Sequence, residues 1–245
     1  MFADRKEAGK QLAKRLDQYF AALPGLDRQA HLIVVGLARG GVPVAFEVAR
    51  RLACPLEVIV AKKLPYPGQN EYAIGAVSST GIVVLSPDVP RNFQWRAYID
   101  QQHHKLLDLT SQSEQQFYSQ AGRKQASFAG KTIIVVDDGV ATGMTALAGL
   151  ETVRRLGADI VIMAAPIVSP LTHKQLQAHC DEVIALSMPF NFSSVGQFYL
   201  DFGQTSSAEV VSLLRESAKF APVLAQPISA LDKSDSPGPE IYKCT

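Results

Sequence analysis

Two adjacent acidic residues, Asp137 and Asp138, follow a short apolar run at positions 132–136. The run is rich in β-branched residues, which predicts a buried strand. Carboxylates accept hydrogen bonds from hydroxyl groups and attract metal ions. Because carboxylates repel phosphate, we expect this pair to face a hydroxyl-bearing or metal-bearing part of a ligand.

Small residues follow the acidic pair, with Thr142 and Thr145 among them, before a predicted helix at 143–156. A helix N-terminus offers unpaired backbone N–H groups and a partial positive charge, which together bind anions. Gly139 and Gly143 let the backbone approach a ligand closely, and the threonine hydroxyls add donors. A ligand with a phosphate at one end and a diol or Mg²⁺ nearby, such as ribose 5-phosphate, suits both halves of the segment.

A second loop, Arg39-Gly40-Gly41, joins a predicted strand at 31–37 to a predicted helix at 43–53. A guanidinium pairs well with phosphate oxygens, and the glycines expose backbone amides. Ligands bind at the carboxyl ends of the strands in open α/β sheets. We therefore expect this loop to lie beside the acidic pair, with a simple tight turn as the alternative.

Three further cations stand near these segments. Lys62 and Lys63 end a predicted strand at 56–61 and would face the same edge of the sheet, either as ligand contacts or as a solvated pair. Arg123 precedes the strand of the acidic pair. For Arg123 the sequence favours a surface charge over a phosphate contact.

Apolar runs alternate with amphipathic segments along most of the chain, which predicts an α/β fold with an open, mainly parallel sheet flanked by helices. The domain is expected to span residues 1–220. Within it, 64–125 form a Pro- and Gly-rich lid loop with a hairpin and a long surface helix at 92–121. Residues 221–245 are expected to form a tail. The other predicted strands are 82–85, 160–165 and 183–186, and the other predicted helices are 4–24, 170–179 and 207–216.

The composition of the 245 residues limits the partners of the protein. The formal net charge is +1, so no global field draws the chain to nucleic acid or membrane. The three cysteines are far apart and form neither a metal-ligand spacing nor a disulfide framework. With no signal peptide and no membrane-spanning run, we expect a cytoplasmic protein without a protein-bound metal cage.

The segment 132–145 resembles the 5-phosphoribosyl 1-pyrophosphate (PRPP) binding motif of the type I phosphoribosyltransferases. The resemblance implies that Asp137 and Asp138 hold the ribose hydroxyls. It assigns the 5′-phosphate to Val140, Ala141, Thr142, Gly143, Met144 and Thr145. Arg39-Gly40-Gly41 resembles the pyrophosphate loop of the same family, and a basic residue at the place of Lys62 or Lys63 helps to bind pyrophosphate there.

The resemblance covers roughly residues 5–216 and extends to predicted phosphoribosyltransferases of unassigned substrate. The segments 63–77 and 189–202 are similar to loops of that branch, the first lying where the family keeps a mobile lid. This implies PRPP and a small-molecule acceptor as partners, Mg²⁺ as cofactor, and the homodimer that is usual in the family. The implied reaction transfers the phosphoribosyl group to a nitrogenous acceptor and releases pyrophosphate.

Two other functions are compatible with a phosphate-binding α/β protein. Some members of the family bind PRPP or a nucleotide and regulate without catalysis, but these often lack the pyrophosphate loop, so Arg39-Gly40-Gly41 favours an enzyme. A dinucleotide enzyme ranks last, because neither Gly-x-Gly-x-x-Gly nor a Walker lysine follows any predicted strand.

No residue is identified as a general base. His31, His103 and His104 are expected to be solvated, and Glu71 in the lid loop is a weak candidate for a substrate contact. Four aromatic residues near the end of the domain are candidates either for stacking on a planar base or for packing in the core. They are Phe190, Phe192, Phe198 and Tyr199.

Overall fold

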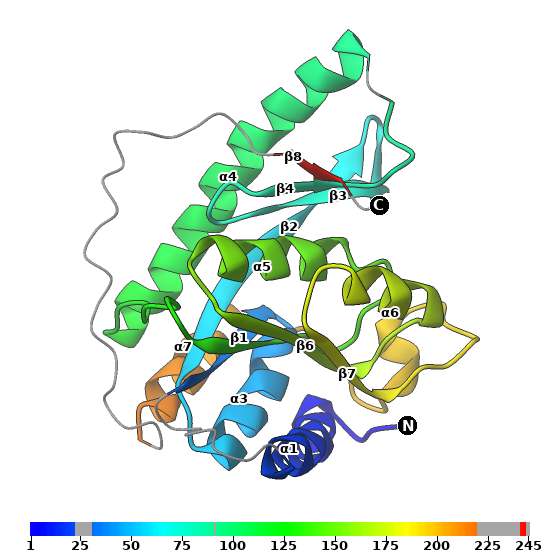
Figure 1. The fold of residues 1–245 in the computed structure, drawn as a ribbon. Coiled ribbons are helices and arrows are strands. Elements are labelled where there is room, and N and C mark those ends of the chain that lie inside the picture. The colour runs from blue at the N-terminus through cyan, green and yellow to red at the C-terminus, as the bar shows by residue number, and fades with distance from the viewer. Residues whose placement is uncertain (23–30, 91, 220–240, 244–245) are drawn as a thin grey trace.

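The structure is a computed structural model that describes residues 1–22, 31–90, 92–219 and 241–243, without the side chains of 70, 71 and 241–243 (Figure 1). Within these ranges the chain alternates strands and helices. In chain order the elements are α1 (Arg5–Ala21), β1 (Leu32–Ala38), α3 (Gly41–Leu52), β2 (Leu56–Tyr66), β3 (Gln69–Ser78), β4 (Val83–Leu85), α4 (Phe93–Ala121), β5 (Thr132–Val136), α5 (Met144–Arg155), β6 (Ile160–Ile167), α6 (Pro170–Gln177), β7 (Glu182–Ser187), the 3-10 helix η1 (Val195–Phe198), α7 (Ser207–Ser217) and β8 (Ile241–Lys243).

The strands form one sheet in the order β7-β6-β5-β1-β2-β3-β4-β8. The strands from β7 to β2 are parallel to their neighbours, whereas β3 is antiparallel to both β2 and β4. The open, mainly parallel sheet that the sequence predicts is therefore confirmed. Because β1 and β5 are neighbours, with Gly36 opposite Val136, the loops that follow them leave the sheet side by side.

Alternate residues of the central strands pack into two separate cores, one on each face of the sheet. On one face, Val34 packs with residues of α1, α3 and α7, such as Leu12, Val48 and Leu214. On the other face, Ile33 packs with residues of α5 and α6, including Leu147. This period-two alternation explains why the parallel strands read as continuous apolar runs, since both faces are covered.

One end of the sheet, here called the hood, is formed by the second half of β2 together with β3 and β4. β2 pairs with β1 only as far as Val60 and then continues into antiparallel pairing with β3. The prediction that β2 ends near Lys62, followed by a loop over 64–81, is therefore wrong in its boundaries, although the hairpin is present. Pro65 lies at an irregularity in the β2–β3 register. Gly75 lets β4 approach closely, since an added Cβ would be 2.2 Å from the Val84 oxygen.

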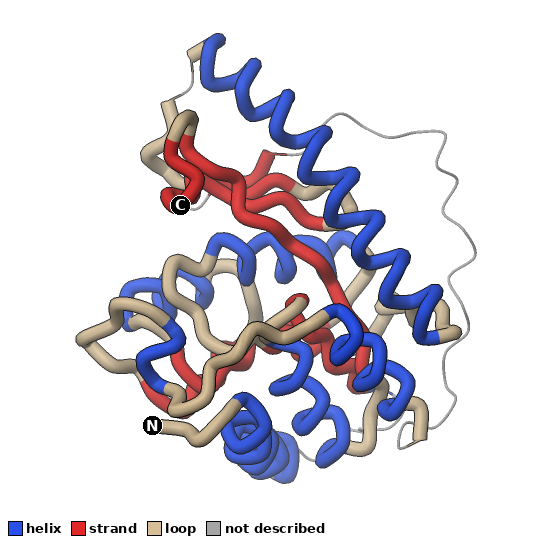
Figure 2. The backbone as a smooth tube through the Cα atoms, turned by 180° about the vertical axis from the view of Figure 1, so that it is seen from behind, coloured by secondary structure: helices blue, strands red, loops and turns tan. Residues whose placement is uncertain are grey.

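The long helix α4 is confirmed, but it is not a mere surface insertion. It begins at Asn92, whose side chain accepts a hydrogen bond from the Trp95 N–H, and ends before Gly122 in the left-handed conformation. Its Phe117 and Tyr118 are buried in the main core, and Figure 2 shows the helix lying along the hood strands. Apolar residues spaced along a polar helix were enough to bury one side of it.

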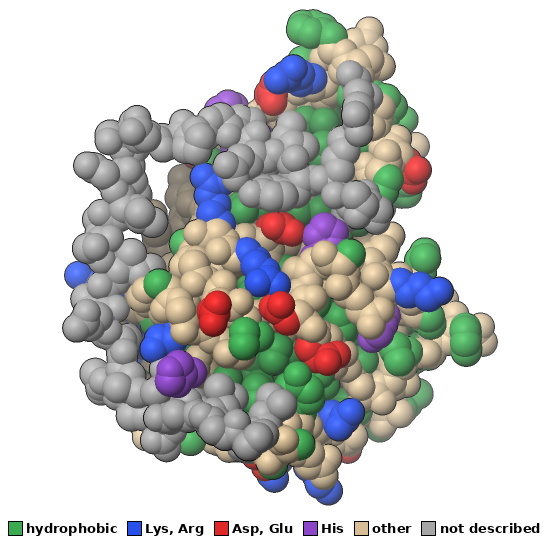
Figure 3. All heavy atoms as spheres, viewed as in Figure 1, with side chains coloured by type: hydrophobic (Ala, Val, Ile, Leu, Met, Phe, Trp, Pro, Cys, Tyr) green, Lys and Arg blue, Asp and Glu red, His purple; other side chains and the backbone are tan. Residues whose placement is uncertain are grey.

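The ends of the predicted domain are only partly described. The predicted end of the first helix at Pro24-Gly25, and most of the tail from 221 onward, lie outside the described residues. The described end of the tail, β8, pairs with β4. No helix in the described part of the chain is long and apolar enough to cross a membrane. Both signs of charge are spread over the face shown in Figure 3, in keeping with the small net charge.

Candidate functional site

The two loops singled out in the sequence meet at the carboxyl edge of the sheet. A Cβ added to Gly40 would lie 2.2 Å from Asp138 Oδ2, and one added to Gly41 would lie 2.5 Å from the Val136 oxygen. The loop after β1 thus packs directly against the loop after β5. At Gly41 the close neighbour is backbone, so only glycine fits there, whereas at Gly40 it is the Asp138 carboxylate, which would have to move.

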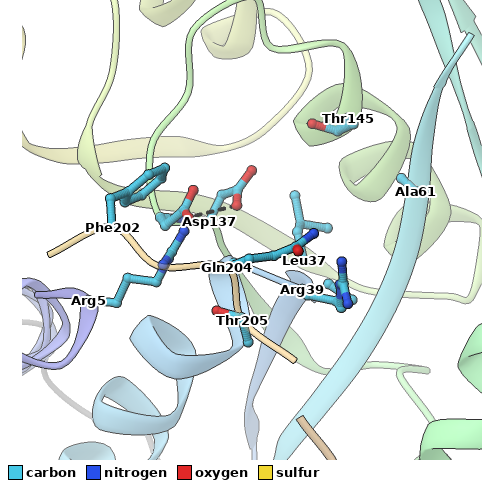
Figure 4. Close-up of a pocket in the computed structure, with 12 residues that line it drawn as sticks. Arg5, Leu37, Arg39, Ala61, Asp137, Thr145, Phe202, Gln204 and Thr205 are labelled. Atoms are coloured by element: carbon cyan, nitrogen blue, oxygen red, sulfur yellow. Dashed lines mark hydrogen bonds and ion pairs between the residues drawn. The ribbon is translucent and has the colours of Figure 1, made fainter. Parts of the chain in front are cut away.

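A cavity of about 320 Å³ opens between these loops (Figure 4). Arg39, Gly40, Asp137, Asp138 and Thr145 line it, as the sequence predicts for a shared ligand site. Seven lining residues were not among the predicted site residues. They are Arg5, Leu37, Ala38, Ala61, Phe202, Gln204 and Thr205.

The loop after the acidic pair presents backbone N–H groups at the start of α5. Gly143 stands before the helix at φ +76° and provides no side-chain cap. Among the described residues, no hydrogen-bond acceptor is recorded for the N–H groups of Thr142, Gly143 and Thr145. Free N–H groups at a helix N-terminus form an anion site, so the geometry suits the phosphate that the motif predicts.

Two members of the predicted phosphate loop are occupied otherwise. The Val140 N–H donates to the Ile167 oxygen at 2.8 Å, and the Val140 side chain is buried. Met144 also points its side chain into the core. The structure therefore corrects the assignment of Val140 as a phosphate donor, because β6 already uses its amide. Met144 can contribute only through its backbone.

The loop is braced from behind by the start of α6. The Ala141 oxygen accepts hydrogen bonds from Ser169 Oγ at 3.1 Å and from Thr172 Oγ1. A Cβ at Gly143 would be 2.6 Å from Thr172 Cγ2. The sequence marks Ser169 only as the N-cap of a helix that begins with a proline, and it carries no signal for Thr172.

The two acids differ in their partners. Asp138 Oδ2 is 2.7 Å from Arg5 Nε, which lowers the pKa of a carboxyl that burial otherwise raises. Burial raises the pKa of Asp137 well above its usual range, and the charge of Asp138 raises it further, while Arg5 and Lys63 lower it. The pair would therefore become more acidic when hydroxyl donors or a cation arrive.

Arg5 is the main functional candidate that sequence reasoning missed. Its Nη1 donates to the Gly203 oxygen at 2.6 Å, and its guanidinium carbon lies 3.9 Å from the centroid of the Phe202 ring. Arg5 is also the first residue of α1. A cation in the first turn of a helix opposes the helix dipole, and this unfavourable placement is the signal that could have identified it.

The two lysines of β2 lie on opposite faces because side chains alternate along a strand. Lys62 lines a second cavity of about 330 Å³, together with Arg39, Ser113 and Ser207. Lys63 is on the side of Asp137, whose pKa its charge lowers. Both lysines are exposed, and the structure places Lys62 at the second cavity and Lys63 within electrostatic reach of Asp137.

Three of the four aromatic candidates for base stacking pack against other protein side chains. Tyr199 is buried against Phe2, and its hydroxyl donates a hydrogen bond to the backbone carbonyl oxygen of Asp138 at 2.5 Å. Phe192 and Phe198 pack on one another, with ring centroids 5.2 Å apart, and Phe190 is 94% exposed. Tyr199 therefore supports the acidic loop from within the core, and Phe202 is the aromatic residue that reaches the cavity.

Two other sequence interpretations need correction. Arg123 is neither a phosphate contact nor a solvated charge, because its Nη2 is 3.0 Å from an oxygen of the fully buried Glu57. His103 is buried rather than solvated, with Nε2 3.1 Å from the Gly81 oxygen. His31 and His104 are exposed as predicted, and the side chain of Glu71 lies outside the described residues.

The fold and the site together define an open α/β protein in which the N-terminus of α5 lies beside an acidic pair. Residues 4–203 match the model of the phosphoribosyl transferase domain. The chain belongs to this family, and with it to a family of transferases.

Relatives support the same assignment. Two proteins from strains of Mycobacterium tuberculosis, each provisionally named a phosphoribosyl transferase, are 42% identical over 216 residues. The match covers 87% of this chain but 46% of each relative, so the chain spans about half the length of these proteins. The crystal structure of the protein TT1426 from Thermus thermophilus superposes with a TM-score of 0.72 at 37% identity. That match covers 91% of this chain and all of that one.

Proposed function

We propose that the protein transfers the 5-phosphoribosyl group of PRPP to a nitrogenous acceptor and releases pyrophosphate. The observation that carries this proposal is that three features line one cavity: the acidic pair, Thr145 in the first turn of α5, and Arg39 and Gly40 of the loop after β1. Each feature suits one part of PRPP, and all three are within reach of a single ligand.

The phosphate and ribose ends of PRPP are assigned to the loop after β5. The 5′-phosphate would accept hydrogen bonds from the N–H groups of Thr142, Gly143 and Thr145 and from the Thr145 hydroxyl. The ribose hydroxyls would donate to Asp137 and Asp138, since ionised carboxylates are acceptors only. This places the anionic and hydroxyl ends of the ligand on groups of matching chemistry.

The pyrophosphate is assigned to the Arg39 side of the site. Arg39 lines both cavities, and the second also contains Lys62 and Ser207 at the N-terminus of α7. Two cations and a helix terminus would neutralise charge on the leaving group. In the reaction, the bond from ribose C1 to the pyrophosphate oxygen breaks and its electron pair leaves with pyrophosphate. A bond from the acceptor nitrogen to C1 forms, and the nitrogen releases a proton.

The acidic pair fits a Mg²⁺ ion that arrives with PRPP rather than one held by a protein cage. No group of three or more His, Cys, Asp or Glu residues in the described ranges is placed to hold an ion. Mg²⁺ is commonly bound through one or two carboxylates and substrate phosphates, and Asp137 faces the cavity with its raised pKa. Such an ion would neutralise part of the pyrophosphate charge.

The proposal is tested by titrating PRPP into the protein by calorimetry, with and without Mg²⁺. We expect Mg²⁺-dependent binding that the Asp137→Asn/Asp138→Asn variant loses, while Asp108→Asn, an exposed position on α4, binds normally. Pyrophosphate release is then measured with a panel of bases and amines. Binding without turnover would favour a regulatory protein, and no binding of PRPP would overturn the proposal.

A further inference from the structure

Arg5 is held in one orientation by three contacts, and this leaves part of its hydrogen-bonding capacity unused. Nε binds Asp138, Nη1 binds the Gly203 oxygen, and the guanidinium stacks on Phe202. A guanidinium has five N–H donors. Within the described part of the chain, Nη2 has no recorded hydrogen-bond acceptor. The Arg5 side chain is 13% exposed, and Nη2 is not one of the buried polar atoms without a hydrogen-bond partner in the described ranges, so these donors are accessible to a ligand.

The unused donors belong to a residue that lines the same cavity as the acidic pair. In Figure 4 the Arg5 side chain reaches the cavity from α1, on the side away from Thr145 and Arg39. On the proposed function, the phosphate is assigned to Thr145 and the pyrophosphate to Arg39, which leaves the part of the cavity lined by Arg5 and Phe202 for the acceptor.

We propose that Arg5 recognises the acceptor, and that the acceptor carries a carboxylate group. A guanidinium fixed by packing and by hydrogen bonds matches a carboxylate in charge and geometry. A neutral carboxamide offers a single oxygen without charge, so its interaction with the same donors is weaker. The inference rests on the proposed function for the position of the acceptor.

The charges around Arg5 restrict where a carboxylate can lie. On the far side of Arg5, a neighbouring cavity is lined by the acids Asp4, Asp201 and Glu209 as well as by Lys6. That cavity would repel an anion. In the central cavity the acids are Asp137 and Asp138, and Asp138 is already paired with Arg5. The uncharged Gln204 and Thr205 complete the wall next to Arg5, so the central cavity is where an acceptor carboxylate fits.

The test compares benzoate with benzamide, which differ only in the carboxylate and cannot react through a ring nitrogen. Binding of each is measured by calorimetry with and without PRPP. We expect benzoate to bind about tenfold more tightly than benzamide, as for a hydrogen bond to a charged group. Arg5→Gln should abolish the difference. Arg15→Gln, an exposed arginine on the same helix, should keep it.

Arg5→Lys serves as a second variant in case Arg5→Gln does not fold. It keeps the charge but loses the planar fork, so the preference for benzoate should fall in part. Equal binding of the two compounds, no binding of either, or a preference that survives in Arg5→Gln would overturn the inference. If the benzoate preference holds but PRPP does not bind, the proposed function fails and the recognition role of Arg5 stands. If PRPP binds but benzoate is not preferred over benzamide, the proposed function stands and the recognition role of Arg5 fails.

Discussion

At the scale of single residues, Asp137 combines a position in the candidate site with an environment unfavourable to a carboxylate. Among the described residues, its recorded hydrogen bond is from the Asp138 N–H to Oδ1, at 2.9 Å, whereas Asp138 has the Arg5 guanidinium. Burial and the adjacent negative charge raise the pKa of Asp137. Such a residue lowers stability in order to present a carboxylate to a ligand.

Asp137→Asn is therefore expected to stabilise the protein and to abolish PRPP binding. A carboxyl whose folded pKa is raised stabilises the fold below its unfolded pKa, and this stability is lost as pH rises toward the folded pKa. Asparagine keeps the Oδ1 acceptor without the charge, so the free energy of unfolding at pH 7 should rise by about 1 kcal/mol. Urea denaturation at pH 4 and pH 7 measures the change in the free energy of unfolding, and the PRPP titration measures the loss of binding. A variant less stable than the parent at pH 7 would contradict it.

Gly40 and Gly41 should respond differently to alanine. At Gly41 the added Cβ would clash with the backbone oxygen of Val136, which is fixed in the sheet. Gly41→Ala should therefore lower the free energy of unfolding by about 1–3 kcal/mol. At Gly40 it meets the Asp138 carboxylate, so Gly40→Ala should weaken PRPP binding more than stability.

Chemical denaturation and PRPP calorimetry distinguish the two glycine effects. Gly203→Ala serves as the control for stability, since its Cβ would have an ordinary contact at 3.5 Å. Equal losses of stability at positions 40 and 41 would show that the packing account is wrong.

At the scale of elements, a buried polar group joins α4 to the sheet. Glu57 on β2 is fully buried, and its two oxygens accept hydrogen bonds from Tyr118 at 2.6 Å and Arg123 at 3.0 Å. Arg123 also donates to Ser217 Oγ and the Leu214 oxygen on α7. These hydrogen bonds therefore connect β2, α4 and α7. Removing one charge would leave the other buried and unpaired.

Arg123→Met should lower the free energy of unfolding, by about 3–5 kcal/mol at pH 8. Burial raises the pKa of Glu57 to about 7 even with Arg123 present. The stability linked to this carboxyl is therefore full at low pH and is lost as pH rises toward 7. Without Arg123 that pKa rises further, so the variant should lose more stability at pH 8 than at pH 5.

Urea denaturation of the Arg123→Met variant at both pH values checks this prediction. Arg96→Met, at an exposed position of α4, provides the matched control and should change little at either pH. The same loss at pH 5 and pH 8 would show that Glu57 does not carry the effect.

At the scale of the whole molecule, the described end of the tail closes the free edge of the hood. β8 pairs in parallel with β4, with Val83 opposite Ile241 and Leu85 opposite Lys243. An uncovered edge strand exposes unpaired N–H and C=O groups and invites pairing between molecules. The site lies on the parallel part of the sheet, at the carboxyl ends of β1 and β5.

A chain that ends at residue 219 should keep PRPP affinity and should self-associate more than the parent in a concentration-dependent way. Sedimentation velocity and PRPP calorimetry measure the two properties. A chain ending at Lys243, which retains β8, is the control. Loss of PRPP affinity in the shorter chain, or an unchanged association state, would contradict this division of roles.

Sequence reasoning was most successful where local chemistry and chain direction were sufficient. The apolar run before Asp137 and the small residues after it specify a strand, a turn and a helix, and the parallel sheet brings Arg39 to the same edge. Sequence reasoning predicted the start of β2 but not its end, because the pairing with β3 outweighs the local effect of Pro65. Cross-strand partners are distant in sequence, so local propensity does not report them.

By itself, the sequence determined the fold class, the two loops and the approximate place of the candidate site, because periodicity and turn chemistry are local properties. Only the tertiary structure decided that Arg5 contacts Asp138 from the start of the chain, that Lys62 lines a second cavity, and that Tyr199 supports the loop from the core. These facts depend on which side chains converge from distant segments. That convergence arises from packing, and no local pattern encodes it.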